Sequence, residues 1–239
     1  MLSVVIPAHN EEASLPRTIN TIHGVLSAAG VPHELVVVND HSTDSTWQVL
    51  KDLTREVPTL RPLDNDGPNG FGYAIRYGLE RYAGDRVTIM MADLSDDPHD
   101  LLRFHAAMDS GKVDCVFGSR AMTGAIVTGY PRGKWLMNRV ANLFLSVVFQ
   151  IRYNDITNPF KLYRRSVMDG LFPLHATGFE LEVELPLKAI VRGATYTIVP
   201  SNWYGREAGE SKMRLLPLIA PYMRLVLGCL REKWTGKRS

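Results

Sequence analysis

The amino-acid sequence predicts an α/β fold, with a mostly parallel sheet that is covered by helices on both faces. The chain has 239 residues, of which 45% are hydrophobic and 22% charged, so it can bury a large core. Two runs, LSVVIP at 2–7 and ELVVVND at 34–40, are apolar at almost every position. Such runs are typical of strands buried on both faces, as in parallel sheets. The helical pattern between them, from Glu11 to about Ala29, completes a strand, helix and strand unit.

The same alternation of helices and strands continues to residue 119. STDSTWQVLKDL begins with a helix-capping pattern, and PHDLLRFHAAM begins with a proline, which is favoured in the first turn of a helix. We expect helices over 42–53, 71–83 and 98–108, and strands over 87–93 and 113–119.

Four polar segments follow the predicted strands, and their positions indicate a binding site. They are PAHNEE at 7–12, NDHSTD at 39–44, ADLSDDP at 92–98 and GSR at 118–120. Ligands of open parallel sheets bind at the carboxyl ends of the strands. We therefore expect these four segments to meet in one crevice, which would be the active site.

Cysteine content and charge narrow the class of protein. The two cysteines, Cys115 and Cys229, are far apart in sequence, which favours a reducing compartment over a disulfide framework. The N-terminal sequence lacks the basic region of a signal peptide, so no secretion is expected. Residues 1–100 contain 7 Lys and Arg against 15 Asp and Glu, whereas residues 101–239 contain 20 against 10. The basic half suits phosphates or an anionic membrane surface, but no nucleic-acid reader motif is present and no nucleic-acid partner is expected.

Two apolar segments in the second half admit two interpretations. Residues 135–151 and 215–230 are apolar, but both contain polar or charged side chains that make them poor membrane spans. In the first, they bury their apolar faces in the core or in the interface of a homo-oligomer. In the second, they are amphipathic helices that lie in the interface of a membrane. The basic tail REKWTGKRS at 231–239 favours a peripheral attachment to the cytoplasmic membrane face.

Seven segments in this order resemble the family 2 inverting glycosyltransferases, which have the GT-A fold. They are VVIPAHNEEASLPRTI, VVVNDHSTDST, NGFGYAIRYGL, MMADLSDDP, VFGSR, NPFKLYRRSV and GESKM. Within the family, the chain is most similar to the dolichyl-phosphate mannose synthase type. The resemblance implies a GT-A domain over 1–213 that includes an apolar acceptor or membrane helix at 132–151, followed by a basic amphipathic extension at 214–239. It also implies a nucleotide-diphosphate sugar donor of the GDP-mannose or UDP-glucose type, Mg²⁺ or Mn²⁺, and a polyprenyl phosphate acceptor.

The resemblance assigns the donor nucleotide to residues in the first 76 positions. PAHNEE resembles the family segment that holds the nucleobase and ribose, and NDHSTDST contains an aspartate at the position that receives hydrogen bonds from the base. The glycines of NGFGYAIRYGL would let the backbone approach the donor at a helix N-terminus. The implied donor-binding residues are Pro7, His9, Asn10, Glu11, Asp40, Gly70, Gly72 and Arg76. The alternatives are a helix cap for Asn10 and turn geometry for the two glycines.

The expected metal-binding segment departs from the family pattern. The family has an aspartate, any residue and an aspartate at the end of this strand, whereas this chain has Met91 and Asp93. Thioether sulfur is a poor ligand for Mg²⁺ or Mn²⁺, which prefer oxygen. Asp93 is therefore the expected metal ligand and donor-binding residue, with Ser95, Asp96 or Asp97 as helpers. The alternative for Asp96 and Asp97 is a favourable charge at the N-terminus of the next helix.

Basic residues of the second half are the implied phosphate ligands. By resemblance, Arg120 and Arg132 bind the acceptor phosphate, while Arg206 and Lys212 bind the donor and stabilise its departing diphosphate. The alternative for all four is an ordinary surface charge. Glu184 matches an acidic position of the family and would orient an arginine or touch the sugar, unless it is a salt-bridged helix residue.

These assignments lead to one expected reaction and two alternatives. The expected reaction is inverting transfer of the sugar to polyprenyl phosphate, which is already anionic and needs no general base. The first alternative is transfer to a saccharide hydroxyl, which needs a base such as Asp93, Asp97 or Glu184. The second is a catalytically silent protein that binds nucleotide sugars, which Met91 in the metal segment would explain.

Overall fold

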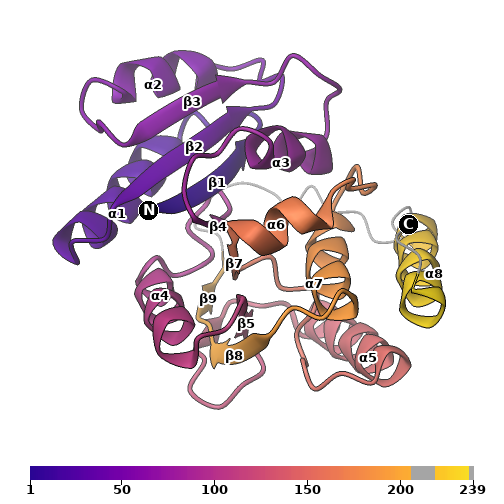
Figure 1. Ribbon diagram of the computed structural model, residues 1–239. Coiled ribbons are helices and arrows are strands. Elements are labelled where there is room, and N and C mark those ends of the chain that lie inside the picture. The colour runs from indigo at the N-terminus through magenta and orange to yellow at the C-terminus, as the bar shows by residue number, and fades with distance from the viewer. Residues whose placement is uncertain (206–218, 237–239) are drawn as a thin grey trace.

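The computed structural model describes residues 1–205 and 219–236, whose helices and strands are shown in Figure 1. The first part of the chain forms β1 (Leu2–Ala8), α1 (Leu15–Ala28), β2 (His33–Asn39), α2 (Thr46–Leu53), β3 (Leu60–Asp64), α3 (Phe71–Leu79), β4 (Arg86–Ile89) and α4 (His99–Gly111). The second part forms β5 (Cys115–Ser119), β6 (Val127–Thr128), α5 (Arg132–Phe149), β7 (Lys161–Arg164), α6 (Arg165–Leu171), α7 (Leu181–Val191), β8 (Tyr196–Pro200), β9 (Trp203–Tyr204) and α8 (Ile219–Thr235).

Seven of these strands form the central sheet, in the order β3, β2, β1, β4, β7, β5, β8. β1 pairs in parallel with both β2 and β4, so that Val5 lies opposite Val36 on one side and Ile89 on the other. β7 is antiparallel to both of its neighbours, β4 and β5. The expectation of a mostly parallel sheet is confirmed, and β6 and β9 form a separate parallel pair.

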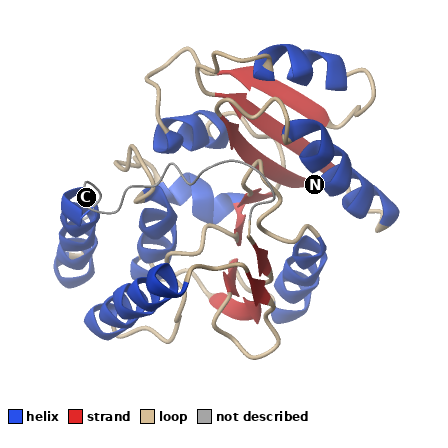
Figure 2. Cartoon of the chain, turned by 180° about the vertical axis from the view of Figure 1, so that it is seen from behind, coloured by secondary structure: helices blue, strands red, loops and turns tan. Residues whose placement is uncertain are grey.

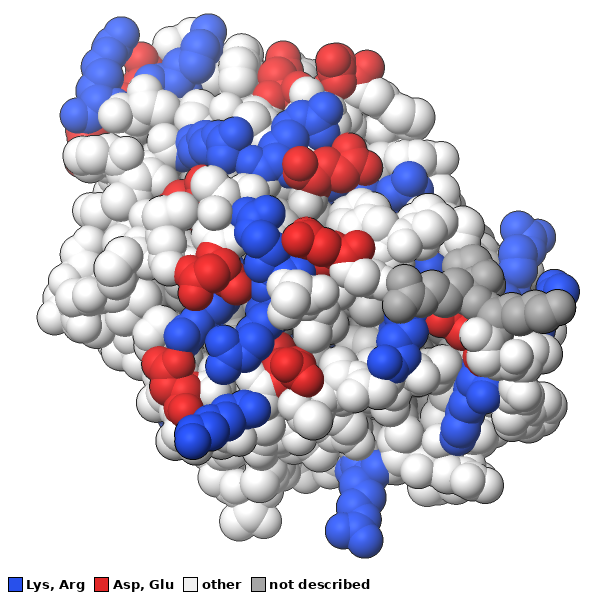
Figure 3. Space-filling model, in the orientation of Figure 1, with Lys and Arg blue, Asp and Glu red and all other residues white. Residues whose placement is uncertain are grey.

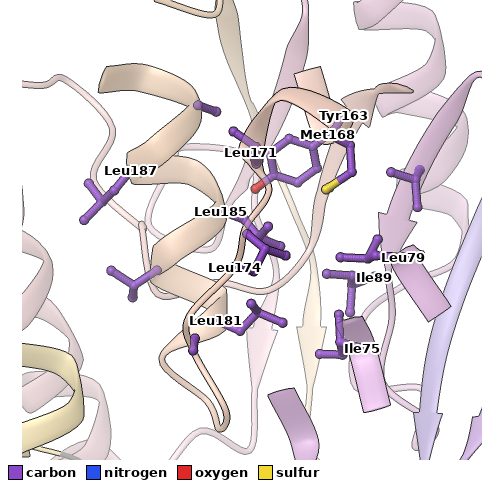
Figure 4. Close-up of a cluster of buried hydrophobic side chains, with 14 of the residues drawn as sticks. Ile75, Leu79, Ile89, Tyr163, Met168, Leu171, Leu174, Leu181, Leu185 and Leu187 are labelled. Atoms are coloured by element: carbon purple, nitrogen blue, oxygen red, sulfur yellow. The ribbon is translucent and has the colours of Figure 1, made fainter. Parts of the chain in front are cut away.

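Helices cover both faces of the sheet, so the core has two layers (Figure 2). Side chains of β1 alternate between the layers: Val5 packs with α3, α6 and α7, whereas Val4 and Ile6 pack with α1, α2 and α4. Figure 4 shows the first layer, in which Ile75 and Leu79 of α3 lie beside Ile89 of β4 and face Leu181 and Leu185 of α7. This alternation explains why β1 is apolar at nearly every position.

The elements that sequence patterns miss or misplace lie at the sheet edges and beside the cavity described below. β3 and β8 are the two edge strands, and β3 contains Arg61 and Pro62, which obscure its strand pattern. The helix expected from Glu11 begins at Leu15: the Glu11 N–H donates to Thr46 Oγ1 at 2.8 Å, and residues 12–14 form a turn before the helix. The strand expected over 87–93 ends at Ile89, after which the chain leaves the sheet.

Helices α5 and α8 lie together on the side of the molecule away from α1 and α2 (Figure 1). Each buries one face, through Leu145 and Phe149 in α5 and through Val226 and Cys229 in α8. Their other faces expose large apolar side chains, namely Leu136, Met137, Val140, Leu143, Phe144 and Val147 of α5 and Ile219, Met223, Leu227 and Trp234 of α8. No described helix combines the length and apolarity that crossing a membrane requires.

Candidate active site

A cavity of about 1070 Å³ opens at the carboxyl ends of the strands, beside the polar segments that follow them. Its polar end includes residues from all four segments, namely Pro7, His9, Glu11, Asp40, Ser95, Asp96 and Arg120. Its apolar end lies between α5 and α8, where Met137, Ala141, Phe144, Leu145, Ile219, Tyr222, Met223 and Val226 line it. The structure therefore joins the polar crevice expected from the sequence to an apolar space lined by α5, the segment expected as an apolar acceptor or membrane helix, and by α8.

The segment after β1 is held against the segment after β2. His9 Nδ1 lies 2.6 Å from the carbonyl oxygen of Asp40, and both residues line the cavity. Asn10 does not line the cavity, and its Oδ1 accepts the N–H of Thr43 at 2.7 Å. Asn10 has a left-handed backbone, with φ 56°, and ties the two loops together. The structure thus gives Asn10 a role in positioning the loops, and its contact with the donor stays a prediction.

Asp40 is buried, and its carboxylate is fixed by two donors. Oδ1 accepts a hydrogen bond from Asn65 Nδ2 at 2.8 Å, and Oδ2 accepts one from the N–H of Gly70 at 2.9 Å. Gly70 has φ 145° and lines the cavity, so the backbone here takes a conformation that favours glycine. Asp40 and Gly70 thus form one rigid wall, as the expectation of a donor site requires.

Two other residues expected at the donor lie elsewhere. A Cβ on Gly72 would lie 2.5 Å from the carbonyl carbon of Thr177, so this glycine allows α3 to pack against the segment at 177–178. The guanidinium of Arg76 lies over the ring of Tyr73, 5.7 Å from its centroid. Neither Gly72 nor Arg76 lines the cavity, so the structure gives both a packing role in place of the expected contact with the donor.

The metal segment turns sharply after Asp93. Oδ1 of Asp93 accepts the N–H of Ser95 at 3.0 Å, and Leu94 between them has φ 55°. Met91, Ser95 and Asp96 line the cavity. Burial, together with the neighbouring Asp93 carboxylate, raises the pKa of Asp96 to about 7.

Asp97 serves the following helix and is not part of the cavity wall. Its Oδ1 accepts the N–H of His99 at 3.0 Å, and its Oδ2 accepts a hydrogen bond from Asn202 Nδ2 at 3.1 Å. These donors hold the pKa of Asp97 below its usual range, although burial acts in the opposite direction. Asp97 therefore fits the alternative of a favourable charge at the N-terminus of the next helix. Its expected role as a helper at the metal is not supported.

The oxygen ligands available at this segment fit Mg²⁺ or Mn²⁺. Asp93 and Asp96 supply carboxylates, and Ser95 supplies a hydroxyl. Oδ2 of Asp96 is buried and accepts no hydrogen bond from the described residues. A buried carboxylate oxygen without a donor is costly unless a cation or a proton satisfies it, so the segment can accept a hard divalent ion.

The expected acceptor-binding arginines occupy different environments. Arg120 is buried on the cavity wall, where Nε and Nη2 donate to Asp155 at 2.9 and 3.0 Å. Arg139 also pairs with Asp155, at 2.8 Å. Asp155 thus orients Arg120, whose Nη1 makes no hydrogen bond to the described residues and is left for a ligand. Arg132 is exposed on the first turn of α5 and does not line the cavity, whereas Lys134 does.

The acidic side chain of α7 that lines the cavity is Glu182, whereas Glu184 fits the alternative of a salt-bridged helix residue. Glu184 is fully buried, pairs with Lys188 at 2.7 Å and accepts the N–H of Ala176 at 2.8 Å. Glu182 lines the cavity, and desolvation raises its pKa to about 8. Nearby Lys161 is fully buried and donates to the carbonyl oxygens of Ile156, Asn158 and Glu182. Helical periodicity separates Glu182 from Glu184 but cannot show which face meets the cavity.

On the face seen in Figure 3, basic and acidic groups lie beside one another in the upper and central parts, and much of the remaining surface is uncharged. Arg206 and Lys212, the two remaining expected donor ligands, lie outside the described residues.

Comparison with known proteins relates this geometry to a family. The model of the family described as Glycosyl transferase family 2 matches residues 3–172. Dolichol-phosphate mannosyltransferase of Pyrococcus furiosus is 28% identical over 239 residues, and the match covers 99% of this chain but only 65% of the archaeal one. Polyprenol monophosphomannose synthase of Mycolicibacterium smegmatis is 29% identical over 218 residues, with 88% of this chain and 80% of the relative covered.

Solved structures share the fold. Glucosyl-3-phosphoglycerate synthase from Mycobacterium tuberculosis, in complex with Mn²⁺, UDP and phosphoglyceric acid, superposes with a TM-score of 0.69 at 21% identity, covering 98% of this chain and 78% of that one. TarS from S. aureus, in complex with UDP-GlcNAc, superposes with a TM-score of 0.68 at 18% identity, covering 97% and 66%.

Proposed function

Because the chain belongs to glycosyl transferase family 2 and has the GT-A fold, it is a glycosyltransferase, and we propose that its acceptor is a polyprenyl phosphate. The donor would be a nucleotide-diphosphate sugar of the GDP-mannose or UDP-glucose type, and the transfer would be inverting. The names of the relatives in Pyrococcus and Mycolicibacterium support this acceptor class. We further propose that the enzyme attaches peripherally to the cytoplasmic face of a membrane.

The observation that carries the proposal is the continuity of the cavity. One wall holds Asp40 and Gly70 at the carboxyl ends of the strands, where a nucleotide would bind, and the far end lies between the apolar faces of α5 and α8. A polyprenyl phosphate has the same division, with a charged phosphate at the end of a long apolar chain. Apolar side chains have no comparable use for a soluble sugar acceptor.

The proposed attachment follows from the exposed faces of the same two helices. Leu136, Val140, Leu143 and Val147 recur at helical spacing along α5, and each is more than 60% exposed. Such a stripe can enter the interface of a bilayer while the polar face of the helix stays on the protein. The helix that lines the lipid end of the cavity would then also meet the lipid phase.

The proposed reaction requires no general base and only a few charged groups that bind phosphates. An acceptor phosphate is already largely anionic, since the second pKa of a phosphate monoester is about 6, so it can attack the anomeric carbon without a base. Asp155 orients Arg120 on the cavity wall, and we expect Nη1 of Arg120 to hold the acceptor phosphate. A bound Mg²⁺ or Mn²⁺ would neutralise charge on the donor diphosphate. Arg206 and Lys212 remain predicted ligands of that diphosphate.

Partition of labelled sugar tests the proposal directly. The purified full chain is incubated with GDP- or UDP-sugars, polyprenyl phosphate and Mg²⁺ or Mn²⁺, and the products are extracted with organic solvent. We expect labelled sugar in the organic phase, its loss in Asp93→Ala, and its retention in Asp97→Asn, whose carboxylate belongs to the start of α4. Label that enters only water-soluble products would refute the lipid acceptor. Activity that appears only in Met91→Asp would identify a silent binding protein.

Transfer to a saccharide hydroxyl is the second candidate, and the carboxyl of Glu182 in the cavity is the observation in its favour. A hydroxyl acceptor needs a general base. Of the bases expected from the sequence, Asp97 accepts two hydrogen bonds and Glu184 is paired with Lys188. Glu182 faces the cavity, but its pKa of about 8 keeps most of it protonated at neutral pH. That protonation favours the phosphate acceptor, which needs no base.

A further inference from the structure

The metal segment lacks a carboxylate at the position where the sequence resemblance requires one. Residue 91 is methionine, and its side chain lies on the cavity wall. A thioether is a soft ligand and does not hold Mg²⁺ or Mn²⁺, which bind carboxylate, hydroxyl and phosphate oxygens. A cation at this segment therefore needs another oxygen ligand beside Asp93.

Asp96 is brought back toward Asp93 by the turn between them. Leu94 has a left-handed backbone, with φ 55°, and the N–H of Ser95 donates to Asp93 Oδ1 at 3.0 Å. The chain is then fixed to the strand β9, because Tyr204 donates its N–H to the Ser95 carbonyl at 2.8 Å. Asp96 itself forms an antiparallel bridge with Trp203. The carboxyl of Asp96 is thus held in place at the cavity wall by backbone contacts.

The carboxyl of Asp96 has no partner that explains its burial. The residue is 2% exposed, it lines the cavity, and its Oδ2 accepts no hydrogen bond from the described residues. Arg120 and Lys161 act on Asp96 electrostatically, but the hydrogen bonds of Arg120 Nε and Nη2 go to Asp155, and those of Lys161 Nζ go to backbone carbonyls. A buried carboxylate without hydrogen-bond donors is costly, and a divalent cation bound there would offset that cost.

We propose that Asp96 supplies the second carboxylate of a divalent cation site, together with Asp93, in place of residue 91. The Ser95 hydroxyl and water would complete the oxygen ligands. The proposal deepens the proposed function, on which it rests for the purpose of the ion, but it concerns binding and can be tested without any sugar transfer.

Binding of Mn²⁺ to the purified full chain is the direct test. Free Mn²⁺ is followed by electron paramagnetic resonance, first with the metal alone and then with GDP or UDP present. We expect Asp96→Asn to weaken Mn²⁺ binding by about tenfold or more, because even the outer partners of metal ligands change affinity by ~10–100-fold. Asp97→Asn is the matched control in the same segment, and we expect it to bind Mn²⁺ as the unaltered chain does.

Rescue distinguishes a ligand from a residue that merely supports the loop. Met91→Asp restores a carboxylate at the position that the resemblance specifies, so we expect the double variant Met91→Asp/Asp96→Asn to regain Mn²⁺ affinity. Thermal unfolding provides a second readout, since an ion that binds only the folded state raises its melting temperature. We expect Mn²⁺ to raise the melting temperature of the unaltered chain and of the double variant, but not of Asp96→Asn.

Two results would overturn the assignment. One is unchanged Mn²⁺ affinity in Asp96→Asn while Asp93→Asn loses it, and the other is no Mn²⁺ binding by the unaltered chain with or without nucleotide. Neither result decides the proposed function, which depends on labelled sugar in the organic phase. Conversely, Mn²⁺ binding that depends on Asp96 in a chain that transfers no sugar would support the site and refute the transferase proposal.

Discussion

Gly72→Ala tests whether this glycine serves packing or approach to the donor. A Cβ at residue 72 would lie 2.5 Å from the carbonyl carbon of Thr177 and 2.7 Å from the nitrogen of Gly178, and both are backbone atoms that cannot rotate away. Overpacking of this kind costs about 1–3 kcal/mol. Alanine is favoured over glycine in a helix by about 1 kcal/mol, which offsets part of that cost. We therefore expect a net loss of up to about 2 kcal/mol.

The assay for Gly72→Ala is thermal unfolding against a matched helical glycine. At this chain length, each kcal/mol shifts the melting temperature by about 2–4 °C, so a fall of up to roughly 8 °C is expected. Gly24 in α1 is the control, because nothing lies within 4 Å of a Cβ built there. Gly24→Ala should raise the melting temperature slightly through helix propensity alone. If Gly72→Ala were as stable as Gly24→Ala but lost donor affinity, the packing explanation would be refuted.

Three further expectations concern charge and the apolar stripe. Asp155→Asn removes the shared partner of Arg120 and Arg139, and we expect it to lower the free energy of unfolding in urea by about 3–5 kcal/mol; a loss below ~1 kcal/mol would contradict this. The folded-state pKa of Glu182 is raised to about 8 from its ordinary value of 4.5, so the unaltered chain loses stability as pH rises through that interval. Glu182→Gln should therefore gain stability relative to it at about pH 9 but not at about pH 4, and equal pH profiles would contradict the assignment. Leu143→Glu should reduce flotation with anionic vesicles without lowering the melting temperature, since Leu143 is 65% exposed; undiminished flotation would argue against membrane contact through α5.

The parallel half of the sheet could be predicted because burial on both faces leaves a clear signal. β1 and β2 are buried at every position, and their runs of apolar residues match the observed strands to within one residue. β7 carries no such signal, because Lys161 and Arg164 mark its two ends. The Lys161 ammonium is satisfied by carbonyl oxygens that are 3 to 21 residues away, a tertiary arrangement that no local pattern contains.

The candidate site was predictable in outline but not in its contacts. Strand ends place His9, Asp40 and Arg120 at one edge of the sheet, and all three line the cavity. Sequence spacing cannot show that Asn10 Oδ1 accepts the N–H of Thr43, or that Gly72 packs against the backbone of Thr177. In both cases the partner is more than 30 residues away. The same short motif therefore contains residues that face the ligand space and residues that hold the motif in shape.

The cavity explains why the first hundred residues of the chain are acidic and the rest basic. The acidic first hundred residues contribute Asp40 and Asp96 to the cavity wall, whereas the basic second part contributes Arg120 and Lys134. An anionic diphosphate would be repelled by carboxylates alone, so an acidic donor end is useful only if a divalent cation binds there as well. A phosphate acceptor requires no such ion, because a guanidinium pairs with it directly. Carboxylates and a guanidinium at the same polar end of one cavity are therefore what a reaction between two phosphate-bearing substrates needs, if only the donor brings a metal ion.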